Sequence, residues 1–378
     1  MALSGGISNS DLVDLQRTTL ENLPDLEFEV ALENQTYIVI NQWFTKEKME
    51  VGSGTSIARN ITLDSSGNAQ HVRLYQKQTL NVGDVQSRLT VPWVQATASY
   101  SIERREALRN RKPAMYISLI KSRRIDAMKA LANLFELRGF LSPESTSDDL
   151  NPYGLPYWVN KVIPSGGTGY SSTIDKAGTF CGRRIIFGQT SAPTYVNNNK
   201  AGINPTASPL FRNYADLYKA IDPNFVVKLR KAFHATHFQS PITIQQMLKG
   251  PMSRYAIYMN LSTIVSYEDL VTKQNDNLGK DADTFHGQTT FKRVPVHYAN
   301  QLDLDDPNNN SWGSNPVYGI NHDKFHPMVM DGDWMRESDP MSDVEQHNVV
   351  STFVDCSYQY ICTNVREGGF VLHLALSA

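Results

Sequence analysis

Cysteine is scarce in this 378-residue sequence, and no apolar run is long enough to cross a bilayer. The three cysteines, Cys181, Cys356 and Cys362, form no CxxC pair and cannot all pair within one chain. We therefore expect ordinary buried thiols in a reducing compartment, not a disulfide framework or a zinc site. The first residues lack a basic region followed by an apolar core, so we predict no signal peptide and a soluble protein made in the cytosol.

Catalytic and phosphate-binding signatures are missing as well. The glycine-rich sequences GSG (52–54) and GTG (167–169) are not followed by GK[ST], as a phosphate-binding loop would require. No GxSxG motif is present. Two histidine pairs, His234/His237 and His322/His326, have spacings that could hold a metal, but no third ligand is placed by spacing. We predict no catalytic residues, no cofactor and no bound metal.

Charge is nearly balanced over the whole chain but not along it. The net charge of −2 gives no global basic field for wholesale nucleic-acid binding. Residues 11–33 carry seven acids and one base, a net of −6, whereas Arg104 to Arg138 carry ten Lys/Arg and three Asp/Glu, a net of +7. The basic segment can attract nucleic-acid phosphates or pair with acidic surface of neighbouring chains, and both readings stay open.

The basic segment belongs to a predicted long helix. A strand-like VPW run at 91–93 passes into a helical stretch that nothing stops before Gly139. Pro113 either opens the main helix at its first turn or kinks it. Apolar residues repeat with a period near 3.6, which predicts one buried stripe. They are Met115, Leu119, Ile125, Met128, Leu131, Phe135 and Leu137. A helix of this length is suited to span a particle, not to line a small pocket.

Residues 35–95 have a different character. Short β-prone runs, among them YIVINQWF and SIARNITL, are separated by glycine-rich turn clusters. The region has too few large apolar residues to form its own core. We predict a long two-stranded excursion that must lie on something else.

The second half of the chain mixes helices and strands. Asp222 and Pro223 have the side chains expected at a helix N-cap and first turn, with Val226, Leu229 and Phe233 on one face. Near the C-terminus two β-prone runs flank a Gly-Gly pair and predict a closing β-ribbon. The elements lack the alternating βαβ rhythm of a parallel sheet, so the predicted class is α+β.

The order of elements resembles the major capsid proteins of tailed bacteriophages, which have the HK97-like fold. Ordered motif blocks carry the resemblance. They are NVGDV (Asn81–Val85), VPW (Val91–Trp93), YSIERRE (Tyr100–Glu106), KSRRIDAM (Lys121–Met128), PYGLPYWV (Pro152–Val159), QNDNLG (Gln274–Gly279), PVYGI (Pro316–Ile320) and the run Val354–Thr363. None of these blocks is a catalytic motif, and they follow one another in order from Asn81 to Thr363.

The resemblance implies a division of the chain into four parts. Residues 1–34 would be an N-terminal arm, and 35–95 an extended E-loop that lies across a neighbouring subunit. Residues 96–160 together with 330–378 would form a peripheral (P) domain on the long helix. Residues 161–329 would form an axial (A) domain whose loops meet around fivefold and sixfold axes.

The resemblance also implies a function without catalysis. The chain would self-assemble into hexamers and pentamers of an icosahedral shell that encloses packaged double-stranded DNA in a virion, assembled in the cytoplasm of a bacterial host. Expected partners are the chain itself, a separate scaffolding protein, a portal and non-specifically contacted DNA, with no membrane. The alternatives are an encapsulin-like compartment shell and a soluble α+β enzyme with an unrecognised site.

Contacts between subunits are predicted at charged residues of these parts. In the E-loop the candidates are Arg59, Arg73 and Arg88, facing acids of a neighbouring P domain. On the long helix they are Arg123 and Arg124, facing the acidic arm of an adjacent subunit. The arm candidates are Asp11, Asp14 and Glu21.

Overall fold

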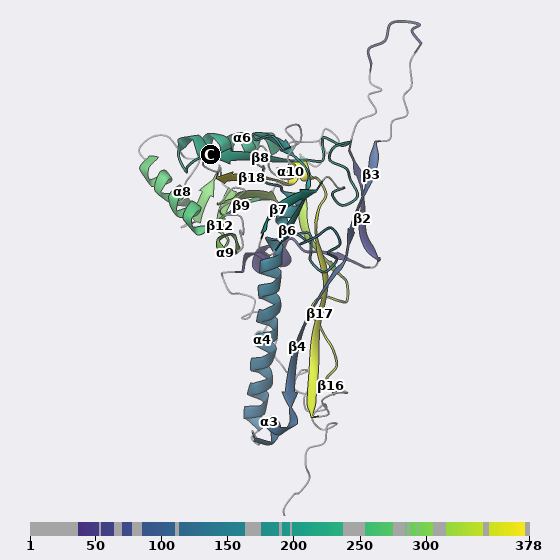
Figure 1. Cartoon of the computed structure of the whole chain (residues 1–378), viewed down its shortest axis with the longest axis vertical. Helices are drawn as coiled ribbons and strands as arrows, with labels where there is room; N and C mark the ends of the chain where they lie inside the picture. The colour runs from purple at the N-terminus through teal and green to yellow at the C-terminus, as the bar shows by residue number, and fades with distance from the viewer. Residues whose placement is uncertain are drawn as a thin grey trace, which may run out of the picture. The chain divides into compact units, whose positions relative to one another are not determined.

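The computed structural model describes most of the chain after residue 36, and Figure 1 shows its path. The described residues are 37–52, 54–63, 70–77, 85–109, 113–162, 175–188, 191–196, 199–236, 254–274, 284–285, 288–292, 294–304, 315–342 and 348–374. They fall into two compact units. Unit 1 takes in the described parts of Met1–Ser53, Val94–Arg138 and Pro327–Tyr358, and unit 2 those of Gly54–Trp93, Gly139–His326 and Gln359–Ala378. The predicted arm, 1–34, lies outside the described residues.

Unit 1 is organised on a six-stranded sheet whose longest pairing joins β4 (Val94–Glu103) to β17 (Val349–Cys362). The two strands run antiparallel over ten residue pairs, from Val94↔Tyr358 to Glu103↔Val349. In β4 the side chains of Val94, Ala96, Tyr100 and Ile102 are buried, the period-two pattern of a strand with one covered face. The other strands are β1 (Met49–Val51), β14 (Phe325–Met330), β15 (Arg336–Glu337) and β16 (Met341–Ser342).

The predicted long helix is present as α3 (Arg104–Arg109) and α4 (Pro113–Gly139). Pro113 is the first residue of α4, so the helix-start reading of this proline is confirmed. Gly139 is the last residue, as expected. Figure 1 shows α4 running alongside β4 and β17. The strand before the helix is longer than predicted, because β4 stays paired with β17 as far as Glu103.

The apolar stripe of α4 faces the unit 1 core. Met128, Leu131 and Phe135 are buried, whereas Ile125 and Leu137 are partly buried. The Phe135 ring centroid lies 4.7 Å from that of Tyr358 on β17 and 5.6 Å from that of Trp334. The helix is therefore held against the sheet by aromatic contacts near its C-terminal end.

The first described segment is a helix, not the strand predicted for YIVINQWF. The π-helix η1 (Val39–Phe44) buries Val39, Ile40 and Trp43, and its Phe44 ring lies 5.3 Å from Phe135 and 4.8 Å from Trp334. Residues 37–51 therefore do not belong to a β-excursion that lacks its own core. The large apolar side chains of 38–44 are buried in unit 1, and that part of the 35–95 prediction is wrong.

Unit 2 contains an eight-stranded sheet in the order β10-β11-β12-β9-β13-β18-β8-β5. The strands are β5 (Thr179–Cys181), β8 (Asn213–Tyr218), β9 (Tyr255–Met259), β10 (Thr284–Phe285), β11 (Gln288–Phe291), β12 (Val294–Tyr298), β13 (Val317–Asn321) and β18 (Gly369–Leu374). Every residue of β9 and β13 is buried, as expected for central strands covered on both faces.

Two further ribbons belong to unit 2. They are β2 (Ser56–Thr62) with β3 (Gln86–Pro92), and β6 (Arg184–Gly188) with β7 (Ser191–Val196). The helices of the unit are α5 (Leu155–Trp158), α6 (Pro223–Thr236), α8 (Leu261–Gln274), α9 (Gln301–Leu304) and α10 (Val365–Gly368). Helices and mostly antiparallel strands together confirm the α+β class.

Helix α6 begins where the sequence predicts. Pro223 is its first residue, and the backbone N–H of Phe225 donates to Asp222 Oδ1 at 2.9 Å. Leu229 and Phe233 are buried as predicted, whereas the third buried residue of this face is Phe225 and not Val226, which is only partly buried. Phe225, Leu229 and Phe233 stand four residues apart and share one side of the helix.

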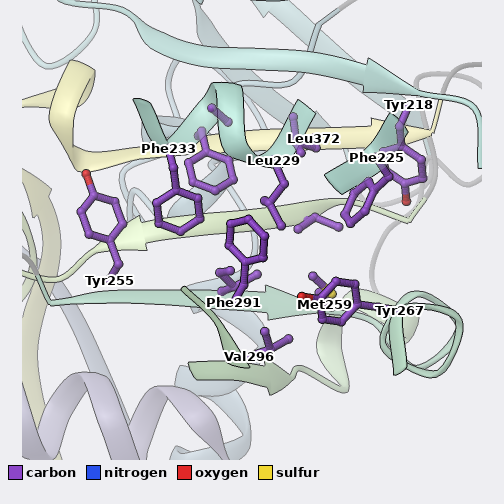
Figure 2. Close-up of a cluster of buried hydrophobic side chains, with 14 of the residues drawn as sticks. Tyr218, Phe225, Leu229, Phe233, Tyr255, Met259, Tyr267, Phe291, Val296 and Leu372 are labelled. Atoms are coloured by element: carbon purple, nitrogen blue, oxygen red, sulfur yellow. The ribbon is translucent and has the colours of Figure 1, made fainter. Parts of the chain in front are cut away.

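Figure 2 shows this face of α6 meeting the sheet of unit 2. The Phe233 ring lies 5.4 Å from Phe291 of β11 and 5.2 Å from Phe370 of β18. Tyr267 of α8 closes the cluster 6.4 Å from Phe225. Unit 2 thus completes a large aromatic core with its own residues.

The predicted closing β-ribbon is absent. β17 pairs in the unit 1 sheet, and β18 pairs with β13 and β8 in the unit 2 sheet. The turn α10 separates them, because Asn364 Oδ1 accepts the N–H groups of Arg366 and Glu367 and caps that turn. The units therefore divide at 138/139 and 358/359, whereas the predicted P domain included 139–160 and 359–378.

Candidate assembly surfaces

The β2–β3 ribbon of unit 2 has one covered and one open face. Ile57 of β2 pairs with Val91 of β3, and both are buried together with Leu89. Arg59 stands opposite Leu89 and is exposed, whereas Arg88 stands opposite Asn60 on the other face and is also exposed. The two predicted contact residues therefore point to different sides of the ribbon, because side chains alternate along a strand.

The base of the ribbon is fixed to the rest of unit 2. The N–H of Thr90 donates to the Ala201 carbonyl at 3.0 Å, and Gln359 Nε2 donates to the Pro92 carbonyl at 3.0 Å. Gly202 lies so close that a Cβ there would be 3.3 Å from the Arg88 carbonyl, and its φ of +91° favours glycine. The ribbon is thus a rigid base for the loop that leaves it.

A cavity of about 310 Å³ lies where the ribbon ends. Its walls are formed by the ends of β2 and β3 and by the segment after Gly202. Lining residues include Leu63, Val85, Ile203, Pro209 and Leu210. The cavity is half apolar, carries no convergent charged groups, and has the character of a packing gap at a loop base more than that of a catalytic pocket.

The described tip of the same loop, 70–77, is exposed at every residue. Leu74 is 85% exposed and Tyr75 is 99% exposed, with Val72 at 45%. Two hydrogen bonds stabilise the turn. The Gln76 N–H donates to the Arg73 carbonyl at 3.1 Å, and Gln76 Oε1 accepts from the Arg73 N–H at 3.0 Å. Adjacent large apolar side chains held outward on a turn are typical of a contact surface.

The predicted contact residues of the long helix are engaged within unit 1. Arg123 Nη2 pairs with both carboxylate oxygens of Glu106 at 2.8 Å, and its Nη1 donates to the Ser101 carbonyl. Arg124 Nε lies 2.6 Å from Glu337 Oε1, with both side chains about four-fifths buried. These guanidinium groups join α4 to α3 and to β15. Their predicted partners in the arm, Asp11, Asp14 and Glu21, lie outside the described residues.

A buried carboxylate joins α4 to η1. Glu136 is 2% exposed and accepts the backbone N–H groups of Ile38 at 3.1 Å and Val39 at 2.7 Å. Burial raises the pKa of Glu136 to about 7, although these hydrogen bonds oppose the shift. The side-chain oxygens of Glu136 accept N–H groups that have no partner within the first turn of the helix, which explains an oxygen acceptor at this position. Nothing in the periodicity of the sequence indicated this role.

The candidate ligands for chemistry have structural partners. His322 Nε2 lies 2.7 Å from the Tyr258 hydroxyl, and His326 Nε2 lies 2.9 Å from the Asp323 carbonyl. Burial lowers the pKa of His322 to about 3, so the ring is neutral. Within the ranges that the structure describes, no group of three or more His, Cys, Asp or Glu side chains is placed to hold a metal ion.

The cysteines behave as predicted. All three are free and buried, and burial raises the pKa of Cys356 and of Cys362 to about 12. They remain protonated thiols, which are poor nucleophiles. Of the helices in the described part of the chain, none is both long and apolar enough to cross a membrane.

Comparison with known proteins gives structural similarities only. No family model and no curated protein sequence matches the chain. A cyanophage A-1(L) capsid chain is similar with 11% identity and a TM-score of 0.48, over 91% of this chain and 93% of that one. A bacteriophage PhiM1 mature capsid chain is similar with 8% identity and a TM-score of 0.48, over 89% of this chain and 88% of that one. The holo-SrpI encapsulin of Synechococcus elongatus is similar with 8% identity and a TM-score of 0.47, over 92% of this chain and 91% of that one.

Proposed function

We propose that this chain is a major capsid protein with an HK97-like fold, and that it self-assembles into hexamers and pentamers of an icosahedral shell around double-stranded DNA. The observation that carries the proposal is the outward tip of the β2–β3 loop, with Leu74 85% and Tyr75 99% exposed. An isolated subunit gains nothing from presenting these side chains to water, whereas a neighbouring copy would bury them.

The two units support an assignment of the P domain and the A domain. Unit 1, with α4 and the β4–β17 pair, would act as the P domain, and the sheet of unit 2 as the A domain. The E-loop would be limited to 54–93, because 37–51 are packed in unit 1. Arg59, Arg73 and Arg88 remain candidates for contacts with a neighbour, since all three are exposed.

The hydrogen bonds of the buried histidines are compatible with a shell role. The histidines that the sequence singled out as a possible ligand pair, His322 and His326, are hydrogen-bonded within unit 2. A scaffolding protein, a portal and contact with packaged DNA would be the expected partners in a bacterial host cell and its virion.

Electron microscopy of the purified full-length chain tests the proposal. We expect closed isometric particles, and a monodisperse population of small oligomers would contradict it. The ratio of absorbance at 260 and 280 nm after nuclease treatment separates a genome-filled shell from a protein compartment. Particles that enclose protein cargo instead of DNA would support the encapsulin-like alternative.

A loop deletion tests the part assigned to the E-loop. The Leu63 N–H donates to the Val85 carbonyl at 2.9 Å, so the ends of the loop are adjacent. Replacing 64–84 by Asn-Gly closes β2 and β3 into a short hairpin and leaves Leu89 and Val91 covered. We expect a folded chain that forms no closed particles, and wild-type particles from this variant would remove the loop from the assembly account.

A further inference from the structure

A tight turn at residues 200–203 of unit 2 is strained. The N–H of Lys200 donates to the Ile203 carbonyl at 2.8 Å, and the N–H of Ile203 donates back to the Lys200 carbonyl at 3.0 Å. The two residues between them have positive φ, +49° at Ala201 and +91° at Gly202. A two-residue turn of this kind requires positive φ, but that conformation is unfavourable for a residue with a Cβ, such as alanine. The contacts around the turn must therefore hold it in place.

Ala201 is hydrogen-bonded on both sides of this turn. Its carbonyl accepts the N–H of Thr90 on β3 at 3.0 Å, and its own N–H donates to the Tyr157 hydroxyl of α5 at 2.9 Å. The cavity of about 310 Å³ at the end of the ribbon is lined by the next two residues, Gly202 and Ile203. The turn thus joins the base of the β2–β3 ribbon to α5, and the close packing ends beside it.

The side chain of Lys200 is the buried anchor of the turn. It is 0% exposed, although Asn199 and Gly202 on either side of the turn are exposed. Its Nζ donates to the carbonyl of Trp158 on α5 at 3.1 Å. An ammonium group has three N–H donors, and among the described residues this carbonyl is the one hydrogen-bond acceptor that Nζ reaches. A positive charge at this position would therefore be poorly compensated.

The groups around the Lys200 amine favour its uncharged form. In the described part of unit 2 the titratable groups that face it are Cys362, Cys181 and Asp175. Burial raises the pKa of both thiols, that of Cys362 to about 12, so they are uncharged at neutral pH. Asp175 Oδ2 lies 3.1 Å from Nε of Arg183, which compensates its charge. The charged groups that act on the two thiols are Arg212, Asp216, Lys324 and Glu367. Burial lowers the pKa of Lys200 to about 7.

We propose that the contact between the 200–203 turn and β3 is acid-sensitive: it is closed while the Lys200 amine is uncharged, and it opens when the amine takes up a proton and reaches water. Opening also relieves the positive φ of Ala201. The bond from Gln359 to the Pro92 carbonyl keeps the ribbon attached to unit 2. The contact lies within one subunit, so this inference does not depend on the proposed shell. In such a shell it would make the direction of the β2–β3 loop sensitive to pH.

Hydrogen exchange of the full-length chain measures the opening. Protection factors, which correct for the intrinsic effect of pH on exchange, are compared at about pH 8.5 and about pH 5.5 for the amides of Thr90 and Ala201. The folded-state pKa of Lys200 is about 7 against an ordinary 10.5, so stability of the closed contact is lost as pH falls through 7. We expect the protection of both amides to fall at least tenfold at the lower pH. The amide of Ile257, on a central strand of the sheet, should keep its protection.

Two substitutions at Lys200 separate the charge of the side chain from its size. Lys200→Met keeps a long unbranched side chain without a charge, so protection of the two amides should be high at both pH values. Lys200→Arg carries a charge at both pH values, so protection should be low at both. Lys219→Met, at an exposed lysine of the same unit, is the matched control and should retain the change with pH of the unsubstituted chain.

A titration of the unsubstituted chain identifies the group without any substitution. With ¹³C at lysine Cε, NMR should show one lysine amine that titrates near pH 7, and its absence would overturn the inference. Equal protection of Thr90 and Ala201 at both pH values would overturn it as well. A tenfold fall that persists in Lys200→Met or in Lys200→Arg would assign the opening to another group. Each of these results can occur whether or not the chain forms closed particles, so this inference and the proposed shell fail separately.

Discussion

The core beneath α6 and the tip of the β2–β3 loop belong to the same unit but treat apolar side chains in opposite ways. Phe233 packs among rings of three strands and is 3% exposed, whereas Tyr75 is 99% exposed on a hydrogen-bonded turn. The first arrangement completes a fold within one chain. The second leaves apolar surface open, and under the proposed shell function another chain would cover it.

The largest loss of stability is expected when a buried ring is removed from the core beneath α6. Phe233→Ala should lower the free energy of unfolding by about 3–5 kcal/mol, because it removes a buried ring and leaves a cavity. Urea denaturation of unassembled subunits measures this loss. Val227→Ala on the same helix is the matched control, since Val227 is 59% exposed and should change stability by less than about 0.5 kcal/mol. Similar losses in the two variants would break the distinction between buried and exposed faces.

A pH-dependent effect of somewhat smaller size is expected in unit 1. The folded-state pKa of Glu136 is about 7 against 4.5 for the unperturbed group, so the unfolded chain releases this proton first as pH rises. Stability from the protonated form is complete below pH 4.5 and is lost as pH rises through 7, by roughly 3 kcal/mol. Glu136→Gln should remove this slope in urea denaturation between pH 4.5 and 8. An unchanged slope would assign the pH dependence to other groups.

The capping of α6 is expected to have a smaller effect. Asp222→Ala removes the side-chain acceptor of the Phe225 N–H and should cost about 1 kcal/mol. Asp222→Asn keeps an acceptor and should recover most of the loss. Equal destabilisation by both changes would point to the charge of Asp222, and not to the hydrogen bond, as the source of the effect.

Local signals of this kind are the part of the fold that the sequence predicted well. Asp222 with Pro223 marked the start of α6, Gly139 marked the end of α4, and a helix start was one of the two roles predicted for Pro113. Each signal depends on the backbone preferences of one or two residues, which tertiary structure did not override.

Contacts between segments that are far apart in the chain could not be predicted from the sequence. YIVINQWF has strong β-propensity, but it is helical, and Glu136, almost a hundred residues away, accepts the N–H groups of Ile38 and Val39 near its start. The two C-terminal runs are strands as expected, but they enter different sheets through partners that only the fold supplies. The sequence predicted that the 35–95 region would lie on something else, but it did not single out Leu74 and Tyr75 as the side chains left exposed.

The smallest effect on subunit stability is expected at the loop tip. Leu74→Ser with Tyr75→Ser removes only exposed side chains and should change the free energy of unfolding by less than about 0.5 kcal/mol. The same variant should fail to form stable closed particles, because the lost contact repeats at every subunit. Normal particles from it would show that the tip is solvated and that other surfaces hold the shell.

Hydroxyl-radical footprinting of Tyr75 tests the central claim most directly. In dissociated subunits this ring is 99% exposed and should react at the rate of a free tyrosine. In assembled particles we expect its reactivity to fall several-fold, while the half-buried Tyr298 provides an internal reference. Equal reactivity of Tyr75 in subunits and in particles would contradict the account, because no neighbouring chain would then cover the tip.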